Sequence, residues 1–262
     1  MTLDLDTCYL GDCLELMKDI EDKSIDMILC DLPYGTTACK WDTIIPFEPL
    51  WEQYKRIIKD NGAIVLTASQ PFTTDLINSA REIFKYELIW DKTVGCDFLN
   101  AKNKPMKSHE NILIFSKGTT ANCSPNKMLY IPQMGRGKPY ATQHKSDQRV
   151  GAFAKGNRTP FNPDYISRSE GERYPLSIIK FARSNYKSSH PTQKPVPLFE
   201  YLIKTYTNEG DLVLDNCMGS GTTAIACINT GRNFIGIEKD EDYFNLAQKR
   251  VKEAQGQKRL DL

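Results

Sequence analysis

The most constraining feature of this sequence is a short segment, residues 25–30, that is rich in apolar residues and runs directly into Asp31-Leu32-Pro33-Tyr34. Its length and composition predict a buried strand of a parallel sheet. Ligands of open α/β sheets bind at the carboxyl ends of such strands. The tetrapeptide is therefore expected in a turn at a ligand-binding edge, although an ordinary turn with an exposed acid would leave the same pattern.

The four residues of this turn suit the binding of a planar ring that carries an amino group. The Asp31 carboxylate and the carbonyl of Leu32 can each accept a hydrogen bond from an –NH2 group. Pro33 restricts φ and stiffens the turn. Tyr34 offers an aromatic face on which a ring can stack.

Strand and helix patterns alternate on both sides of this turn. Strands are expected at residues 7–10, 25–30, 63–67, 86–90, 111–115, 212–214 and 234–237, and helices at 13–20, 47–59, 71–81, 197–207, 222–229 and 240–254. The sequence 60–62 is read as the cap of the second helix, and residues 255–262 as a frayed tail. The order predicts an α/β fold with a mixed, mainly parallel sheet and an antiparallel edge strand.

Residues 119–189 break this alternation. They contain twelve basic and four acidic residues, a net charge of +8, whereas the whole chain carries +1 and the remainder therefore −7. Basic residues interleaved with Tyr and Phe suit a phosphate backbone and unstacked bases, although a solvated basic loop has the same composition. We divide the chain into residues 1–118, 119–189 and 190–262.

A second candidate site follows the strand at 212–214. Asp215 opens a turn that contains Gly219 and Gly221, and Glu238 ends the next strand. This order is typical of a nucleotide-cofactor loop with an acid for the ribose hydroxyls, and the Gly-Lys-Ser/Thr ending of a P-loop is missing. Acids at the ends of several expected strands, Asp12 and Asp31 among them, disfavour a pyrophosphate. They favour the cationic cofactor S-adenosylmethionine.

The eight cysteines include no Cys-x-x-Cys pair and the three histidines are scattered, so no metal site is expected. The cysteines are interpreted as reduced thiols of a cytoplasmic protein. The sequence has neither a signal-peptide pattern nor an apolar run of membrane-spanning length, so no membrane partner is expected.

Three motifs in a fixed order resemble the β class of amino-methylating DNA methyltransferases. Asp31-Leu32-Pro33-Tyr34 matches the catalytic Asp-Pro-Pro-Tyr of that family, residues 190–195 match His-Pro-x-Gln-Lys-Pro, and Asp215 to Thr223 matches Asp-Pro-Phe-x-Gly-Ser-Gly-Thr-Thr. Leu32 replaces a proline whose role is its carbonyl, which Leu retains. Asn216 and Cys217 replace Pro-Phe, of which the Phe packs against the cofactor in the family. The resemblance therefore does not define this contact with the cofactor.

The resemblance implies a Rossmann-like S-adenosylmethionine-dependent methyltransferase fold, with a catalytic half (1–118), a target-recognition insertion (119–189) and a cofactor-binding half (190–262). It implies double-stranded DNA as partner, a possible homodimer, and a place on DNA in the cytoplasm of a bacterial or phage-infected cell. The implied catalytic residues are Asp31, Leu32, Pro33 and Tyr34. The implied cofactor-binding residues are Asp12, Asp31, Lys194, Asp215, Met218, Gly219, Ser220, Gly221, Thr222, Thr223 and Glu238.

The reaction implied by the family is methylation of the exocyclic N6 of an adenine flipped out of DNA. Methylation of cytosine N4 uses the same chemistry, but family members of that kind more often begin the motif with Ser, so Asp31 favours adenine. RNA or a protein glutamine amide is a further alternative substrate, and the basic insertion argues against the protein. A DNA-binding module without catalysis is disfavoured by the intact Asp31, Pro33 and Tyr34.

Overall fold

The computed structural model describes residues 3–35, 42–143, 166–183 and 193–260. The chain forms two compact units, one made of Met1–Ile131 and Ser177–Leu262 and the other of Pro132–Leu176. The expected insertion 119–189 therefore contains the whole second unit together with two flanking stretches that fold with the first. Each unit is described by itself.

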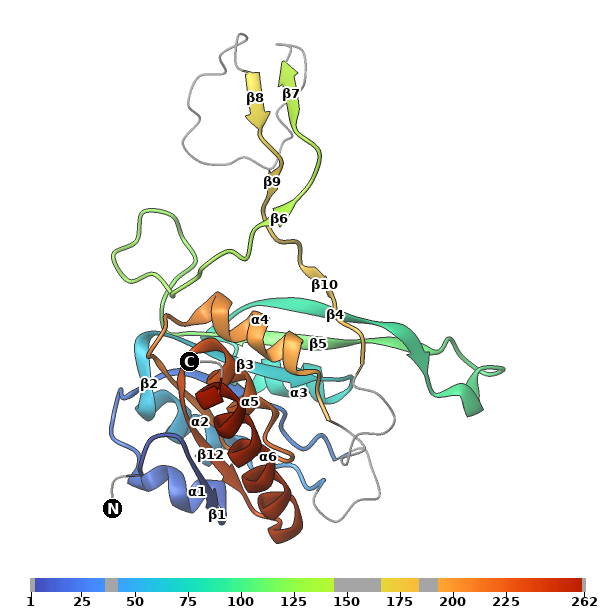
Figure 1. Ribbon diagram of the computed structural model, residues 1–262. Helices are drawn as coiled ribbons and strands as arrows, with labels where there is room; N and C mark the ends of the chain where they lie inside the picture. Colours follow the sequence, from blue (N-terminus) through green and yellow to red (C-terminus); the bar gives the residue numbers. More distant parts are fainter. Residues whose placement is uncertain (1–2, 36–41, 144–165, 184–192, 261–262) are drawn as a thin grey trace. The chain divides into compact units, whose positions relative to one another are not determined.

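The first unit is built on an eight-stranded sheet, counted over the described residues, with the order β1-β12-β11-β2-β3-β5-β4-β10. Its strands are β1 (Thr7–Leu10), β2 (Ile25–Cys30), β3 (Ile58–Ala68), β4 (Phe84–Cys96), β5 (Lys107–Phe115), β10 (Ile178–Lys180), β11 (Leu212–Asp215) and β12 (Asn233–Glu238). Only β5 pairs antiparallel with its neighbours, β3 and β4. The mixed, mainly parallel sheet is confirmed. The antiparallel strand lies inside the sheet, and β10 forms the edge next to β4 (Figure 1).

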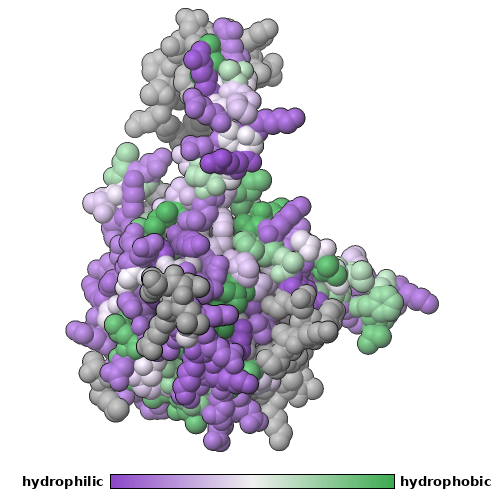
Figure 2. All heavy atoms as spheres, in the orientation of Figure 1, coloured by the Kyte–Doolittle hydropathy of each residue, from purple (hydrophilic) through white to green (hydrophobic). Residues whose placement is uncertain are grey.

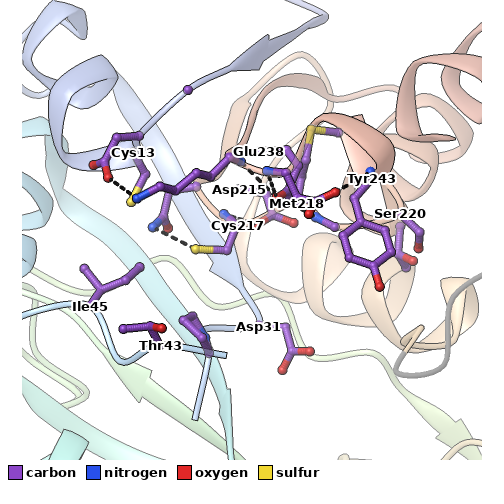
Figure 3. Close-up of a pocket in the computed structure, with 18 of the residues that line it drawn as sticks. Cys13, Asp31, Thr43, Ile45, Asp215, Cys217, Met218, Ser220, Glu238 and Tyr243 are labelled. Atoms are coloured by element: carbon purple, nitrogen blue, oxygen red, sulfur yellow. Dashed lines mark hydrogen bonds and ion pairs between the residues drawn. The ribbon is translucent and has the colours of Figure 1, made fainter. Parts of the chain in front are cut away.

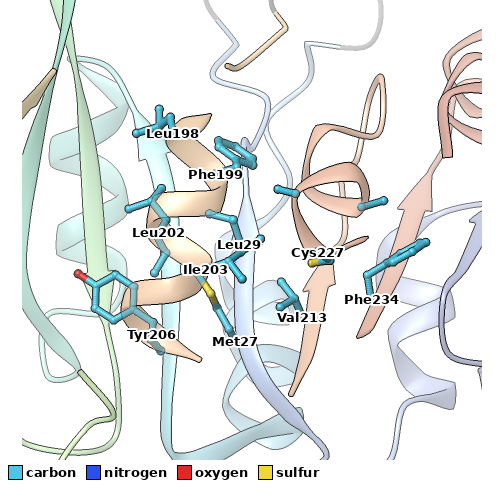
Figure 4. Packing of buried hydrophobic residues seen from close by; sticks show 14 of the residues in the cluster. Met27, Leu29, Leu198, Phe199, Leu202, Ile203, Tyr206, Val213, Cys227 and Phe234 are labelled. Carbon is cyan, nitrogen blue, oxygen red and sulfur yellow. The ribbon is translucent and has the colours of Figure 1, made fainter. Parts of the chain in front are cut away.

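Helices cover both faces of this sheet. They are α1 (Cys13–Leu16) with the short 3-10 helix η1 (Met17–Asp19), α2 (Phe47–Ile57), α3 (Phe72–Ser79), α4 (Val196–Tyr206), α5 (Thr222–Thr230) and α6 (Glu241–Leu260). Alternate residues of β2 divide between two cores. Met27 and Leu29 pack in a cluster with α4, α5 and α6 (Figure 4), and Ile28 packs in a cluster with α1, α2 and α3.

The sheet has its switch point between β2 and β11. These strands pair in parallel, with Val213 beside Met27 and Leu214 beside Ile28. The chain continues from β2 to β3 on one side and from β11 to β12 on the other. Asp31 and Asp215 therefore follow neighbouring strands at the same edge, as the sequence predicted, although more than 180 residues separate them.

The expected helix cap at residues 60–62 is wrong. Helix α2 ends at Ile57, Ile58 is already extended, and β3 runs through this segment. Gly62 is required for a different reason. A Cβ atom there would lie 2.7 Å from the carbonyl oxygen of Asp26 in β2. The glycine allows the two strands to approach each other closely.

The expected frayed tail is also wrong over most of its length, because α6 continues to Leu260. Gln, Lys and Arg are good helix formers, and they offset the single Gly256 in this stretch. Within the described ranges, no helix is both long and apolar enough to cross a membrane.

The second unit contains two short antiparallel ribbons, β6 (Gly135–Arg136) with β9 (Glu172–Arg173) and β7 (Tyr140–Gln143) with β8 (Ile166–Ser169). The guanidinium of Arg173 lies 4.8 Å from the centre of the Tyr140 ring and donates a 2.6 Å hydrogen bond to Ser169. This arginine therefore ties the two ribbons together.

Candidate active site

A cavity of about 470 Å³ opens in the first unit where β2, β11 and β12 end (Figure 3). The predicted site residues that line it are Asp12, Asp31, Pro33, Lys194, Asp215, Met218, Gly219, Ser220, Thr222 and Glu238. The other four, Leu32, Tyr34, Gly221 and Thr223, are described but do not belong to its lining. The structure thus brings both motif loops to one cavity.

The Asp31 carboxylate is held from two sides. Its Oδ1 accepts hydrogen bonds from the hydroxyl of Tyr34, at 2.7 Å, and from that of Thr67. Its Oδ2 accepts a 2.6 Å hydrogen bond from Nζ of Lys194, whose side chain is only 9% exposed. This arrangement fixes the carboxylate while one edge of it still faces the cavity.

Lys194 leads into a chain of alternating charges that the sequence analysis missed. Its Nζ lies 3.3 Å from Oε2 of Glu110 in β5, and Oε1 of Glu110 pairs with Lys92 in β4. Burial disfavours the Lys194 ammonium, but the Asp31 and Glu110 carboxylates outweigh it and raise the pKa of Lys194. Burial would raise the pKa of Glu110, yet Lys194 and Lys92 lower it. Lys194 and Glu110 are therefore both charged near neutral pH.

Tyr34 lies next to Asp31 but does not line the cavity. Its ring stacks on Phe72 with centroids 5.2 Å apart, and Nζ of Lys194 lies 5.7 Å from its centroid. Burial, followed by the negative charges of Asp31 and Glu110, holds the pKa of the Tyr34 hydroxyl well above its usual value. The hydroxyl is therefore a hydrogen-bond donor to Asp31. Stacking of a target ring on Tyr34 stays a prediction.

The replacement of proline by Leu32 has a packing explanation. The Leu32 side chain is buried in the core cluster on the α2 side of the sheet, where it contributes apolar contacts. Asn216, another departure from the family pattern, is anchored by the hydroxyl of Tyr54, which donates to its side-chain carbonyl. Cys217 lines the cavity in place of the aromatic residue.

The glycine loop is shaped by positive φ values and by Glu238. Gly219 has φ 50° and Gly221 has φ 79°, a region that favours glycine. The Glu238 Oε2 accepts a 2.7 Å hydrogen bond from the amide of Gly219, and its Oε1 accepts from the amides of Lys239 and Asp240 at 2.9 and 2.8 Å. The acid therefore joins the loop to the start of α6.

Two acids of the cavity, Asp215 and Glu238, have pKa values that burial raises. Burial raises the pKa of Asp215 to about 7, although the Thr223 hydroxyl and the Cys217 amide donate to its carboxylate. Burial likewise raises the pKa of Glu238. A cationic ligand would stabilise the ionised form of both acids.

Asp12 lies at the rim of the same cavity. It caps α1 through the amide of Leu14 at 3.0 Å, and it pairs with Lys239 at 3.0 Å. The hydrogen bond from Lys239 lowers the pKa of Asp12. Across the described residues, no group of three or more His, Cys, Asp and Glu side chains is arranged to hold a metal ion.

One of the three motifs lies partly outside the described residues. Residues 190–192 of the His-Pro-x-Gln-Lys-Pro match lie outside the described residues, whereas Gln193 and Lys194 line the cavity. The hydroxyl of Thr222 lies 3.4 Å from the carbonyl oxygen of Lys194. This contact links the segment that carries Lys194 to the glycine loop.

Replacing Lys194 with methionine should destabilise the fold strongly. The change removes a buried ammonium from between the Asp31 and Glu110 carboxylates, and breaking such a pair costs about 3–5 kcal/mol. The matched control is Lys18→Met, because Lys18 pairs with Glu15 at the surface and both side chains are more than half exposed. That change should cost less than about 1 kcal/mol. Urea unfolding measures the free energy of unfolding of both variants. Equal losses in this free energy would show that the Lys194 ion pair stabilises the fold no more than a surface ion pair does.

The comparisons with known proteins agree with this arrangement. The family model described as a DNA methylase of the N6/N4 type matches residues 25–249. Type II methyltransferase M1.MboII of Moraxella bovis is 29% identical over 259 residues, which cover 94% of this chain and 96% of the relative. DNA adenine methyltransferase YhdJ of Escherichia coli (strain K12) is 29% identical over 260 residues, which cover 94% and 82%.

Solved structures of methyltransferases share the fold. The M1.HpyAVI–SAM complex is 26% identical with a TM-score of 0.59, over 93% of this chain and 98% of that one. PvuII DNA methyltransferase, described as cytosine-N4-specific, has a TM-score of 0.62 over 98% and 93% at 14% identity, which shows the fold alone. Because the family model covers most of the sequence, the chain belongs to the N6/N4 DNA methylase family and is a DNA methyltransferase.

Proposed function

We propose that this DNA methyltransferase transfers the methyl group of S-adenosylmethionine to the exocyclic N6 of an adenine flipped out of duplex DNA. One observation carries the proposal. An acid suited to hold an amine, Asp31, lines the same cavity as two acids suited to a cation, the buried Asp215 and the half-buried Glu238. The two loops come from opposite ends of the chain, so their meeting at one cavity is a property of the fold.

The residues of the cavity fit S-adenosylmethionine, which carries a sulfonium and an ammonium and no phosphate. Asp12, Asp215 and Glu238 would attract those charges, and the loop around Gly219 and Gly221 would let the backbone approach the ligand. Met218, Ser220, Thr222 and Thr223 complete that loop, and Lys194 links it to Asp31. The Glu238 Oε2 accepts a single backbone hydrogen bond and retains a lone pair for a ribose hydroxyl. Bound cofactor supplies the electrophilic methyl group.

The chain's own residues prepare the amine. The lone pair of the amino nitrogen is delocalised into the adenine ring, so the nitrogen is a poor nucleophile. Asp31 and the carbonyl of Leu32 would accept its two N–H groups and localise the lone pair, while Pro33 keeps the turn rigid. Asp31 would receive the proton after transfer. Tyr34 would offer its ring to the base and recover part of the cost of flipping.

Lys194 now occupies the Oδ2 atom of Asp31, and an incoming amine would compete for that position. Glu110 offers the lysine a second anion, because its buried Oε2 lies 3.3 Å from Nζ and accepts no hydrogen bond from any residue that the structure describes. A small movement of the ammonium towards Glu110 would free a lone pair on Asp31 and keep Lys194 paired, while the hydroxyls of Tyr34 and Thr67 still donate to Asp31.

Methylation of cytosine N4 is the second candidate, because the same two acceptors suit either amine. Asp31 at the start of the motif and the adenine-specific relative favour adenine. Modification-sensitive sequencing of DNA from cells that express the protein decides between them. We expect N6-methyladenine within a defined sequence, and N4-methylcytosine alone would overturn the adenine assignment.

For the domain organisation we propose a catalytic half (1–118), a target-recognition insertion (119–189) and a cofactor-binding half (190–262). The net charge of +8 in the insertion, against −7 in the remainder, supports the insertion as the part that grips DNA. The expected place of the enzyme is with the DNA in the cytoplasm. A homodimer is a further possibility for this class.

Replacing Asp31 with asparagine should lower the turnover number by more than about a hundredfold, because the amide is a weaker acceptor and cannot take the proton. Cofactor affinity should stay within about threefold of wild type. Asp60→Asn is the control, since Asp60 is an exposed acid that also pairs with lysines. Tritium transfer and calorimetry give the two quantities. Turnover above about a tenth of wild type would remove Asp31 from the proposed chemistry.

Cofactor affinity should rise with pH. Burial raises the pKa of Asp215 to about 7, so the carboxyl is mostly neutral at pH 5.5 and half ionised at pH 7. Only the ionised form attracts a cation, and affinity should therefore increase by about tenfold across this interval. The raised pKa of Glu238 acts in the same direction. Calorimetry on the wild type and on Asp215→Asn is the test, and the variant should show a shallower dependence. If the affinity of the wild type and that of the variant depend equally on pH, the Asp215 carboxylate does not attract the cationic cofactor.

The proposed insertion should dominate the salt dependence of DNA binding. Replacing Arg136, Lys138 and Arg168 together with glutamine should reduce the slope of log K against log salt by roughly 0.9 for each lost phosphate contact. Triple replacement of Lys18, Lys23 and Lys55, which form surface ion pairs elsewhere, is the control. Titrations at several salt concentrations measure both. An unchanged slope in the first variant would mean that these residues do not contact phosphates.

A further inference from the structure

The end of the β4–β5 hairpin is a second surface that suits DNA. Strands β4 and β5 are joined by the segment 97–106, which includes the short 3-10 helix η2 (Phe98–Asn100). Four apolar side chains near this end are exposed: Val94 by 58%, Phe98 by 79%, Leu99 by 93% and Met106 by 45%. Figure 1 shows the hairpin extending beyond the rest of the sheet, and Figure 2 shows hydrophobic residues gathered at its end.

The hairpin end is a defined structure held by its own contacts. Asp97 adopts a left-handed conformation, with φ 70°. Its carboxylate accepts a 2.6 Å hydrogen bond from Asn100 and pairs with Lys104 at 2.6 Å. The side chains of Phe98 and Leu99 take no part in these polar contacts. Burial of such a side chain stabilises a fold by about 1.5–3 kcal/mol, and an exposed side chain lacks this stabilisation. An exposed apolar cluster therefore marks an interaction site.

The hairpin extends from the sheet edge at which the cavity opens. Because β5 is antiparallel to both β3 and β4, strand β4 runs in the same direction as β3 and β2. Its carboxyl end therefore lies at the same edge as Asp31. The hairpin base is tied there, since Lys107 donates a hydrogen bond to Ser69, just after β3, and Glu110 pairs with Lys194.

We propose that the hairpin end is an apolar wedge that packs against the DNA duplex beside the flipped adenine. The inference rests on the proposed function, since a base that reaches Asp31 must come from DNA lying along this edge. The charges agree. Residues 94–107 carry Lys102, Lys104 and Lys107 against the single acid Asp97, a net of +2. Outside this hairpin and residues 119–189, the chain carries −9. Apolar side chains flanked by lysines match unstacked bases flanked by phosphates.

A second copy of the chain is a less suitable occupant. Stable protein interfaces bury about 1,200–2,000 Å² in total. Four side chains at the end of a narrow hairpin supply only a fraction of that area. A wedge between bases needs only one or two apolar side chains, and Phe98 and Leu99 are adjacent and the most exposed of the four.

The test compares two DNA substrates. The double variant Phe98→Ser, Leu99→Ser is assayed on a duplex with a paired target adenine and on the same duplex with an abasic site opposite that adenine. We expect kcat/KM on the paired duplex to fall at least tenfold. On the abasic duplex it should stay within about threefold of wild type, because the target is already unpaired. The control is Leu5→Ser, since Leu5 is 52% exposed and precedes β1 at the opposite edge of the sheet. Cofactor affinity of all three proteins should be the same.

Any of the following results would overturn the proposal that the hairpin end is a wedge. Equal activity of wild type and double variant on the paired duplex removes any role for these side chains. Equal losses on both duplexes indicate a defect unrelated to base extrusion. If sedimentation shows a wild-type dimer that the double variant cannot form, the hairpin contacts a second copy. A wild type that methylates neither duplex, at any adenine, refutes the proposed function itself and the wedge with it.

Discussion

The ion pair between Asp31 and Lys194 is the contact on which the arrangement of the cavity depends. It joins two residues 163 positions apart, one after the central strand and the other just before α4. Both side chains are largely shielded from water, and each has further partners: Tyr34 and Thr67 for the acid, Glu110 for the lysine. A buried charge is tolerated when it is paired and hydrogen-bonded. The pairing therefore couples the position of the first loop to correct folding of the last quarter of the chain.

The sequence predicted those parts of the molecule that depend on short runs of adjacent residues. The strand before Asp31, the glycine turn after Asp215 and the acid Glu238 each depend on a few adjacent residues, and their order indicates a common sheet edge. The chain through Lys92 and Glu110 could not be read this way. These residues lie 18 positions apart on two strands, and only the hairpin register brings them together. The same holds for Gly62, whose local sequence is typical of a helix cap. Its real constraint is the backbone of β2, which only the folded sheet supplies.

Glu238 shows how one side chain can serve both the fold and a ligand. Three backbone amides donate to its carboxylate, so the glycine loop and the start of α6 are already in place around the cavity. Burial nevertheless raises its pKa, because these donors do not compensate fully for the lost water. The same imbalance is larger at Asp215. Burial therefore destabilises the ionised form of both acids. A cation that enters the cavity would stabilise the two carboxylates and offset this cost. In the proposed reaction that cation is the cofactor.

The distribution of charge then limits how DNA can approach. Outside residues 119–189 and the β4–β5 hairpin the chain carries a net charge of −9, which disfavours the approach of a duplex to those parts. The exceptions are the basic segment 119–189 and the lysines of the β4–β5 hairpin. The hairpin stands at the same sheet edge as the cavity, and its base is joined to the site through Glu110 and Lys194. A duplex attracted by these lysines would therefore be held next to Asp31. Apolar side chains would then stand where a base pair has to open. On this view the net negative charge of the remaining chain disfavours other orientations, and the hairpin lysines hold the duplex at the sheet edge where the cavity opens.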